Sequence, residues 1–265
     1  MARERYLYAN MSAVIHKETS EHTHTVIFLH GKDSNSQDFA DEFLESEASE
    51  PAGGSRTLPD LFPGIRWVFP QAPILHSEHF NMWRWFDICV TALLDVIKAE
   101  EVLVPRRHIY LGGISQGFAT ALATFFANGQ GMAGLIGLCS WMPFADQVED
   151  LKAPHAEGRK ASDVSDEQLF SAVQAMYFGQ RSQGESSSPL LRSTPIFLGH
   201  AKDDNIVPIK NARRMRDVLV NSLSMNVEME EYKDGGHWVN EPQGVDDIVE
   251  FLKQTMRIVG CLREV

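Results

Sequence analysis

The feature that most limits the fold of this chain is a repeated alternation of short apolar runs with helical patterns. The runs lie at 25–30, 65–70, 108–112, 135–139 and 195–199, and a sixth, alternating run lies at 226–232. Runs that are apolar nearly throughout predict strands buried on both faces, which is typical of parallel sheets. We therefore expect an α/β fold with a mainly parallel sheet and helices on both faces.

The same pattern suggests one main domain. We expect a polar leader over 1–24, the domain over 25–258 and a short tail over 259–265. Residues 145–194 are variable in character and predict an insertion or a lid. The Ser-rich stretch at 182–188 resembles a linker, but the strand–helix alternation resumes after it, so we do not expect a boundary there.

Charge and cysteine content exclude several classes of protein. The formal net charge of −12 disfavours nucleic acid as a partner. No apolar run is long enough for a signal peptide or a membrane span, so the cytoplasm is the expected location. The cysteines, Cys89, Cys139 and Cys261, are widely spaced, which predicts neither a disulfide framework nor a structural zinc site. We expect no metal and no cofactor, and the sequence leaves the oligomeric state open.

The strongest chemical signal is the run from Gly113 to Gly117, Gly-Ile-Ser-Gln-Gly, between a predicted strand and a predicted helix. This is the context of a nucleophile elbow, in which a strained turn presents the serine hydroxyl at the edge of the sheet. Small residues on either side let strand and helix approach each other. An ordinary glycine-rich turn is the alternative, but the setting favours Ser115 as a nucleophile.

A serine hydroxyl needs a base, and the base needs an orienting acid. The acid is expected in a loop after a later strand, where Asp203 and Asp204 are adjacent. The pattern Asp-x-x-Val-Pro favours Asp204, and Asp203 suits a turn-capping role. The base is expected after the last strand, and His237 follows a Gly-Gly pair there. The order Ser, Asp, His is the one that this arrangement requires.

The remaining site predictions are the oxyanion hole and the substrate groove. Two backbone N–H groups must face the developing oxyanion, and we assign them to Lys32 and Gln116, with His30 and Gly31 shaping the first loop. An apolar groove is expected from side chains near the strand ends, although packing in the core is an equally good reading for each of them. These residues are Met82, Trp83, Trp85, Phe86, Trp141 and Met142.

Several runs together resemble the acyl-protein thioesterase family, also called the phospholipase/carboxylesterase family. They are Val26–Gly31, Phe69–Pro73, Trp85–Asp87, Leu111–Gly117, Cys139–Pro143 and Asp204-x-x-Val-Pro208. The resemblance covers about residues 25–255. It implies an α/β-hydrolase fold with little or no cap domain, no cofactor, and an ester or thioester substrate. S-acylated proteins, lysophospholipids and short-chain esters are the implied substrate classes.

The chain departs from this family in two places. Lys32 and the run Asp33-Ser-Asn-Ser stand where the family has Leu-Gly-Asp-Thr, which makes the mouth of the acyl site more polar. The segment 88–107 lacks the family's extra loop, although a crossover needs only about 10–12 residues. We expect a serine carboxylesterase or thioesterase that forms an acyl-enzyme. The alternatives are a small-ester hydrolase in a biosynthetic pathway and a fold that only binds a ligand or partner.

Overall fold

The sheet of this chain is central and mainly parallel. A computed structural model describes residues 4–72, 82–128, 130–152, 165–178 and 188–261. The strands are β1 (Glu4–Leu7), β2 (Ser12–His16), β3 (His24–Leu29), β4 (Ile65–Pro70), β5 (Ile109–Ile114), β6 (Gly134–Leu138), β7 (Ile196–Ala201) and β8 (Val227–Tyr232). Their order in the sheet is β1-β2-β4-β3-β5-β6-β7-β8. All pairs from β4 to β8 are parallel, and β2 pairs antiparallel with β1 and with β4.

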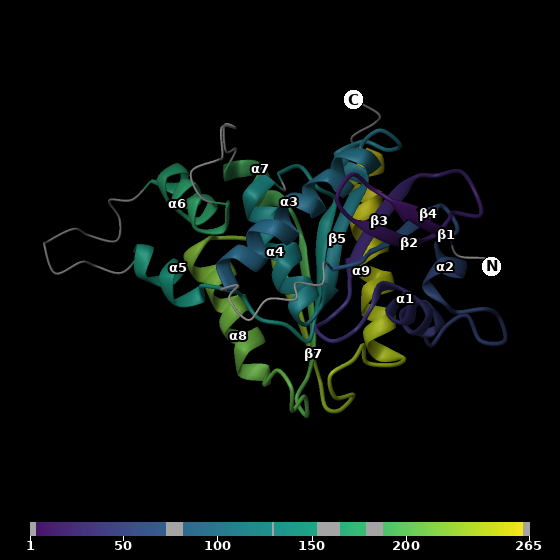
Figure 1. Cartoon of the computed structure of the whole chain (residues 1–265). Helices are drawn as coiled ribbons and strands as arrows, with labels where there is room; N and C mark the ends of the chain where they lie inside the picture. Colours follow the sequence, from purple (N-terminus) through teal and green to yellow (C-terminus); the bar gives the residue numbers. More distant parts are fainter. Residues whose placement is uncertain (1–3, 73–81, 129, 153–164, 179–187, 262–265) are drawn as a thin grey trace, which may run out of the picture.

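Helices cover both faces of this sheet (Figure 1). They are α1 (Ser36–Glu45), α2 (Leu58–Leu61), α3 (Met82–Glu100), α4 (Gln116–Asn128), α5 (Ala145–Lys152), α6 (Asp166–Phe178), α7 (Ser188–Ser193), α8 (Ile209–Asp217) and α9 (Gln243–Cys261). One apolar core joins the sheet to α3, α4 and α6, and the other joins it to α1 and α9. The predicted α/β architecture is thus confirmed. In the described part of the chain, no helix combines the length and apolarity that a bilayer crossing needs.

The beginning of the chain differs from the expected polar leader, because it adds two strands to the sheet. The run from Ser12 to His16 buries its three central apolar residues and pairs with β4. Tyr8, between β1 and β2, donates a 2.6 Å hydrogen bond to buried Glu100, which also pairs with Arg66. Burial of the short apolar run and of this polar group fixes the segment against the domain. The prediction failed because the run has only five residues.

The crossover from β4 to β5 is made by a longer helix than the sequence predicted. The pattern of residues 91–102 predicts a short helix, and 71–87 shows no clear period, whereas α3 already begins at Met82. A 3₁₀ turn, Arg106–His108, then leads directly into β5. The short segment 88–107 therefore suffices to close the sheet. Helices α5, α6 and α7 lie within 145–194, and the expected role of that region as a lid stays a prediction.

Candidate active site

Ser115 lies at the turn where β5 ends and α4 begins, and its backbone is in the left-handed region at φ 56°. A non-glycine residue there costs about 1–2 kcal/mol, so the surroundings must hold it. Its N–H donates to the carbonyl of Leu138 (2.9 Å), and its carbonyl accepts from the hydroxyl of Ser140 (2.6 Å). Such strain at the end of a strand is the geometry expected of a nucleophile elbow.

The two glycines that flank this turn have no room for a side chain. A Cβ on Gly117 would lie 2.4 Å from the carbonyl oxygen of Leu29 and 2.5 Å from that of His30. A Cβ on Gly113 would lie 2.7 Å from the same Leu29 oxygen. The turn therefore packs directly on the end of β3, which brings the loop that follows β3 beside Ser115.

Asp204, and not Asp203, contacts His237. Oδ2 of Asp204 lies 2.7 Å from Nδ1 of His237, and its Oδ1 accepts the backbone N–H groups of Ile206 and Val207 at 2.9 Å each. Asp203 instead accepts the N–H of Gly236 (2.9 Å). Since a carboxylate can only accept, Nδ1 of His237 carries a hydrogen, and Nε2 is left with a free lone pair. This is the tautomer that a general base for a hydroxyl requires.

His200 also contacts Asp204, which the sequence did not indicate. Its Nε2 lies 2.7 Å from the carbonyl of Val207 and 3.3 Å from Oδ2 of Asp204. Both are acceptors, so Nε2 carries the hydrogen. Burial lowers the pKa of His200, which keeps the ring neutral. The single Nε2–H of His200 donates to the nearer acceptor, the carbonyl of Val207, and the ring lies beside Asp204. Only the placement of His200 four residues before Asp204 could have signalled this contact.

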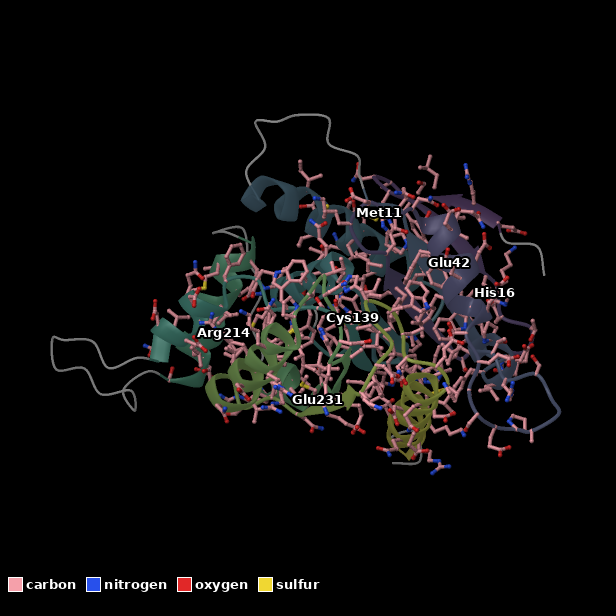
Figure 2. All side chains as sticks on the ribbon, turned by 90° about the horizontal axis from the view of Figure 1, so that it is seen from below. Met11, His16, Glu42, Cys139, Arg214 and Glu231 are labelled. Atoms are coloured by element: carbon pink, nitrogen blue, oxygen red, sulfur yellow. The ribbon has the colours of Figure 1, made fainter. Side chains whose placement is uncertain are left out.

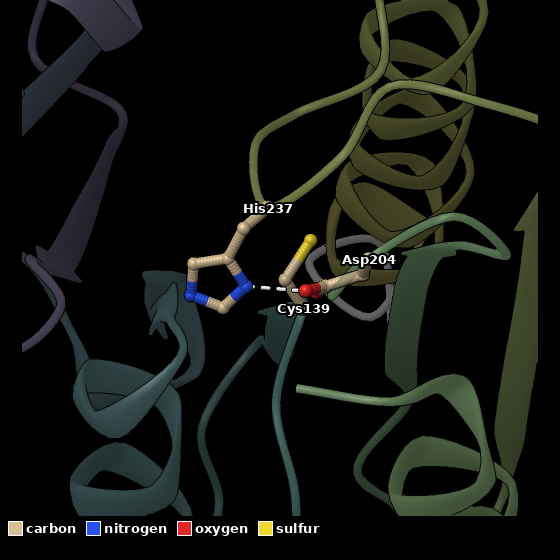
Figure 3. Close-up of side chains that lie close together, drawn as sticks. All are labelled: Cys139, Asp204 and His237. Atoms are coloured by element: carbon tan, nitrogen blue, oxygen red, sulfur yellow. Dashed lines mark hydrogen bonds and ion pairs between the residues drawn. The ribbon is translucent and has the colours of Figure 1, made fainter. Parts of the chain in front are cut away.

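Cys139, which Figure 2 labels, connects the Ser115 turn with the His237 loop. It follows Leu138, whose carbonyl binds Ser115, and its own N–H donates to Gly199 at 3.0 Å. Its Sγ lies 3.3 Å from the carbonyl of Trp238, the residue after His237. Figure 3 shows Cys139 beside the His237–Asp204 pair. The ends of β6 and β7 and the His237 loop therefore meet at one edge of the sheet.

The loop after β3 is held in place by His30. The N–H of Ala72, just after β4, donates to Nε2 of His30 (3.1 Å), so Nδ1 carries the hydrogen and donates to the carbonyl of Gly31 (2.8 Å). Burial lowers the pKa of His30, which favours this neutral form. A Cβ on Gly31 would lie 3.4 Å from the Cβ of Ser115. The backbone after Gly31 therefore starts beside the serine.

A cavity of about 580 Å³ opens beside this loop. Both predicted oxyanion residues, Lys32 and Gln116, line it. The other described lining residues are Met11, Leu29, His30, Gly31, Asp33, Ser34, Asn35, Pro70, Gln71, Ala72, Cys89, Gly117 and Thr120. Much of the lining is apolar, and the run 32–35, which departs from the family, contributes polar side chains to it.

The predicted groove residues do not gather at this cavity as far as the structure describes them. Met142 is buried in the core, and Trp141 is partly buried against the same core, outside the described cavity lining. Core packing therefore describes Met142 best. The others lie in the first turns of α3, and their side chains fall outside the described residues; they are Met82, Trp83, Trp85 and Phe86.

Together these groups can perform nucleophilic acyl transfer. A strained serine lies at a helix N-terminus, an imidazole with a fixed tautomer lies on a buried carboxylate, and Gly31 of the first loop lies beside the serine. The helix N-terminus favours developing negative charge.

Comparisons with known proteins agree with this reading. A family model described as phospholipase/carboxylesterase matches residues 172–256, which include Asp204 and His237. Acyl-protein thioesterase 1 of Yarrowia lipolytica is 25% identical over 258 residues, covering 89% of this chain and 93% of the relative. That of Schizosaccharomyces pombe is 24% identical and covers 95% and 98%.

Solved structures match over nearly the whole chain. Zea mays acyl-protein thioesterase 2 superposes with a TM-score of 0.60 at 19% identity, covering 92% of this chain and 98% of the other. Esterase PE8 gives 0.60 at 17% identity, covering 93% and 100%. At these identities the matches establish the fold, which is that of the α/β-hydrolases. The comparisons find similarity to acyl-protein thioesterases, as the sequence motifs did.

Proposed function

We propose that this chain belongs to the phospholipase/carboxylesterase family and is a serine hydrolase that cleaves carboxylic ester or thioester bonds through an acyl-enzyme. Its similarity to acyl-protein thioesterases supports an esterase or thioesterase function. The observation that carries the proposal is that the left-handed turn of Ser115 and the loop of His237, whose Nδ1 is bound to a buried carboxylate, are joined through residues 138–139. The proposed catalytic residues are Ser115, Asp204 and His237.

The reaction follows from these positions. Oγ of Ser115 attacks the substrate carbonyl carbon while Nε2 of His237 takes the hydroxyl proton. The carbonyl electron pair moves onto oxygen, and the N–H groups of Lys32 and Gln116 stabilise that charge. When the tetrahedral intermediate collapses, His237 returns the proton to the departing alcohol or thiol. Water then repeats the sequence on the acyl-enzyme, which releases the acid and restores Ser115.

The position of the cavity supports an acyl group as its occupant. Ser115 follows the central strand β5, and its base approaches from the side of β6 and β7. The leaving group receives its proton from His237, so it departs on that side. The cavity lies on the opposite side, beside β3 and β4. We therefore propose that the acyl chain extends into the cavity, past Gln116.

The test compares wild-type protein with Ser115→Ala on p-nitrophenyl acetate and butyrate. Each buried methylene contributes about 0.8 kcal/mol, so kcat/KM should rise about fourfold per methylene, or about 15-fold between the two esters. Ser115→Ala should lower kcat at least about 10⁴-fold. A folded wild-type protein that is no more active than Ser115→Ala would contradict the proposal and favour a binding role. If the wild type is active, matched S-butyryl and O-butyryl substrates separate thioesterase from esterase activity.

A further inference from the structure

A cysteine, a carboxylate and a histidine that are far apart in the sequence converge at the edge of the sheet. Cys139 follows β6, Asp204 follows β7, and His237 lies in the loop after β8. Each offers one possible ligand atom, and these atoms all lie within 4.8 Å of one another (Figure 3). Thiolate, imidazole and carboxylate are ligand types that zinc binds.

We propose that Cys139, Asp204 and His237 form an inhibitory binding site for Zn²⁺ and for the softer ion Cd²⁺. The sequence predicted no metal site, because its cysteines lack the usual spacing. The fold supplies the three ligands instead. Binding itself does not depend on the proposed hydrolase activity, whereas the inhibition rests on it.

The hydrogen bonds of the cluster explain how an ion could enter without leaving a buried carboxylate unpaired. Oδ1 of Asp204 keeps its two backbone N–H groups, and Nε2 of His200 stays beside Oδ2 at 3.3 Å. The ion replaces only the hydrogen that lies between Nδ1 of His237 and Oδ2 of Asp204. The contacts given up elsewhere are those of the thiol with the carbonyls of Trp238 (3.3 Å) and Gly236 (3.9 Å), and a thiol is a weak donor.

The geometry requires a small adjustment. Zinc bonds of about 2.0–2.3 Å at tetrahedral angles place ligand atoms about 3.3–3.5 Å apart. The His237–Asp204 contact of 2.7 Å must therefore lengthen, and the thiol must turn towards it. His237 can move, because 23% of its side chain is exposed and Gly235 and Gly236 precede it with positive φ.

The charges and protons balance. Burial raises the pKa of the Cys139 thiol to about 12, so the thiol is protonated at neutral pH and must lose that proton to the solvent on binding. The imidazole proton moves from Nδ1 to Nε2 and is not released. The thiolate and the carboxylate then neutralise the divalent ion, so no net charge is left buried. One released proton makes the affinity rise about tenfold per pH unit between pH 7 and 8.

The consequence for the reaction follows from the tautomer. With the ion on Nδ1, Nε2 of His237 carries the hydrogen and has no lone pair for the Ser115 proton. The metal-bound protein therefore lacks its general base.

Cadmium offers a readout that is independent of activity, since thiolate ligands give it an ultraviolet charge-transfer absorption. We expect wild-type protein to show this band with one equivalent of Cd²⁺. Cys139→Ser and Cys139→Ala should lack it, and Cys89→Ser and Cys261→Ser should keep it. Zn²⁺ should inhibit ester hydrolysis, and Cys139→Ser should need at least about ten times more Zn²⁺ for half inhibition, relative to its own metal-free rate.

A wild-type protein without the band, or a band that persists in both folded Cys139 variants, would overturn the site. Zn²⁺ inhibition that Cys139→Ser leaves unchanged would overturn the inhibitory role. A band in a protein whose ester hydrolysis does not depend on Ser115 would support the metal site and refute the proposed function.

Discussion

Replacing Asp204 with asparagine tests the arrangement of hydrogen bonds around the proposed base. Asparagine has one oxygen and one NH₂ group where the carboxylate has two oxygens. The N–H groups of Ile206 and Val207 both point at Oδ1, so the amide oxygen should take that position. The NH₂ group then faces Nδ1 of His237, which must become an acceptor and carry its hydrogen on Nε2 instead. The base for Ser115 is lost.

The size of the effect follows from this tautomer. A Ser-His-Asp arrangement with the wrong tautomer loses about 10⁴ in kcat, which corresponds to about 5.5 kcal/mol of transition-state stabilisation. The NH₂ group would also lie beside Nε2 of His200, which carries a hydrogen, so two donors would face each other. The free energy of unfolding should therefore fall by about 1–3 kcal/mol. The assay is kcat on p-nitrophenyl butyrate, with urea denaturation to verify folding.

Asp203→Asn is the matched control. Its Oδ1 accepts only the N–H of Gly236, and an amide oxygen can accept it equally well. This variant should keep most of its activity. The reasoning is refuted if Asp204→Asn stays within about tenfold of the wild-type kcat, or if Asp203→Asn falls as far.

Three further perturbations probe the surroundings of the site. Gly117→Ala should lower the free energy of unfolding, measured in urea, by about 3 kcal/mol or more, because its Cβ would lie 2.4 Å from the Leu29 oxygen. Gly54→Ala, whose Cβ has its nearest contact at 3.4 Å, should be nearly neutral, and equal effects of the two variants would contradict the reasoning. Burial raises the pKa of Tyr110 from 10.0 to about 12, so its contribution to stability is present below pH 10 and is lost between pH 10 and 12. In Tyr110→Phe the free energy of unfolding, measured in urea, should therefore fall less steeply with pH over this range, and an unchanged slope would refute the reasoning. His200→Met should lower the free energy of unfolding by about 1–3 kcal/mol in urea, because the buried carbonyl of Val207 would lose its 2.7 Å hydrogen bond from Nε2. His200→Gln keeps a donor and should lose less; equal effects of the two variants would argue against this role.

Local patterns made the β5–α4 turn at Ser115 and its strand predictable. The Gly-x-Ser-x-Gly run and the flanking apolar strand and helix are continuous in sequence, so the steric need for Gly113 and Gly117 is visible there. Asp204 was separable from Asp203 by the Val-Pro that follows, and the structure has the same choice of partner for His237. Elements of this kind depend on neighbouring residues alone.

Features that depend on distant contacts were not predictable. The run Ser12–His16 becomes a strand because β4 offers it an edge, which five residues cannot reveal. The contact of His200 with Asp204 depends on the path of one loop. Cys139 meets Asp204 and His237 only because three strand ends share one edge of the sheet. The first turns of α3 lack apolar periodicity, so their helix was missed.

The most direct test of the proposed function is the mass of the intact protein after brief mixing with p-nitrophenyl butyrate and acid quenching. We expect one butyryl adduct, located by peptide mapping on the peptide that contains Ser115, and no adduct in Ser115→Ala. An adduct on another residue, or ester turnover that persists in Ser115→Ala, would contradict the acyl-enzyme mechanism proposed for this chain.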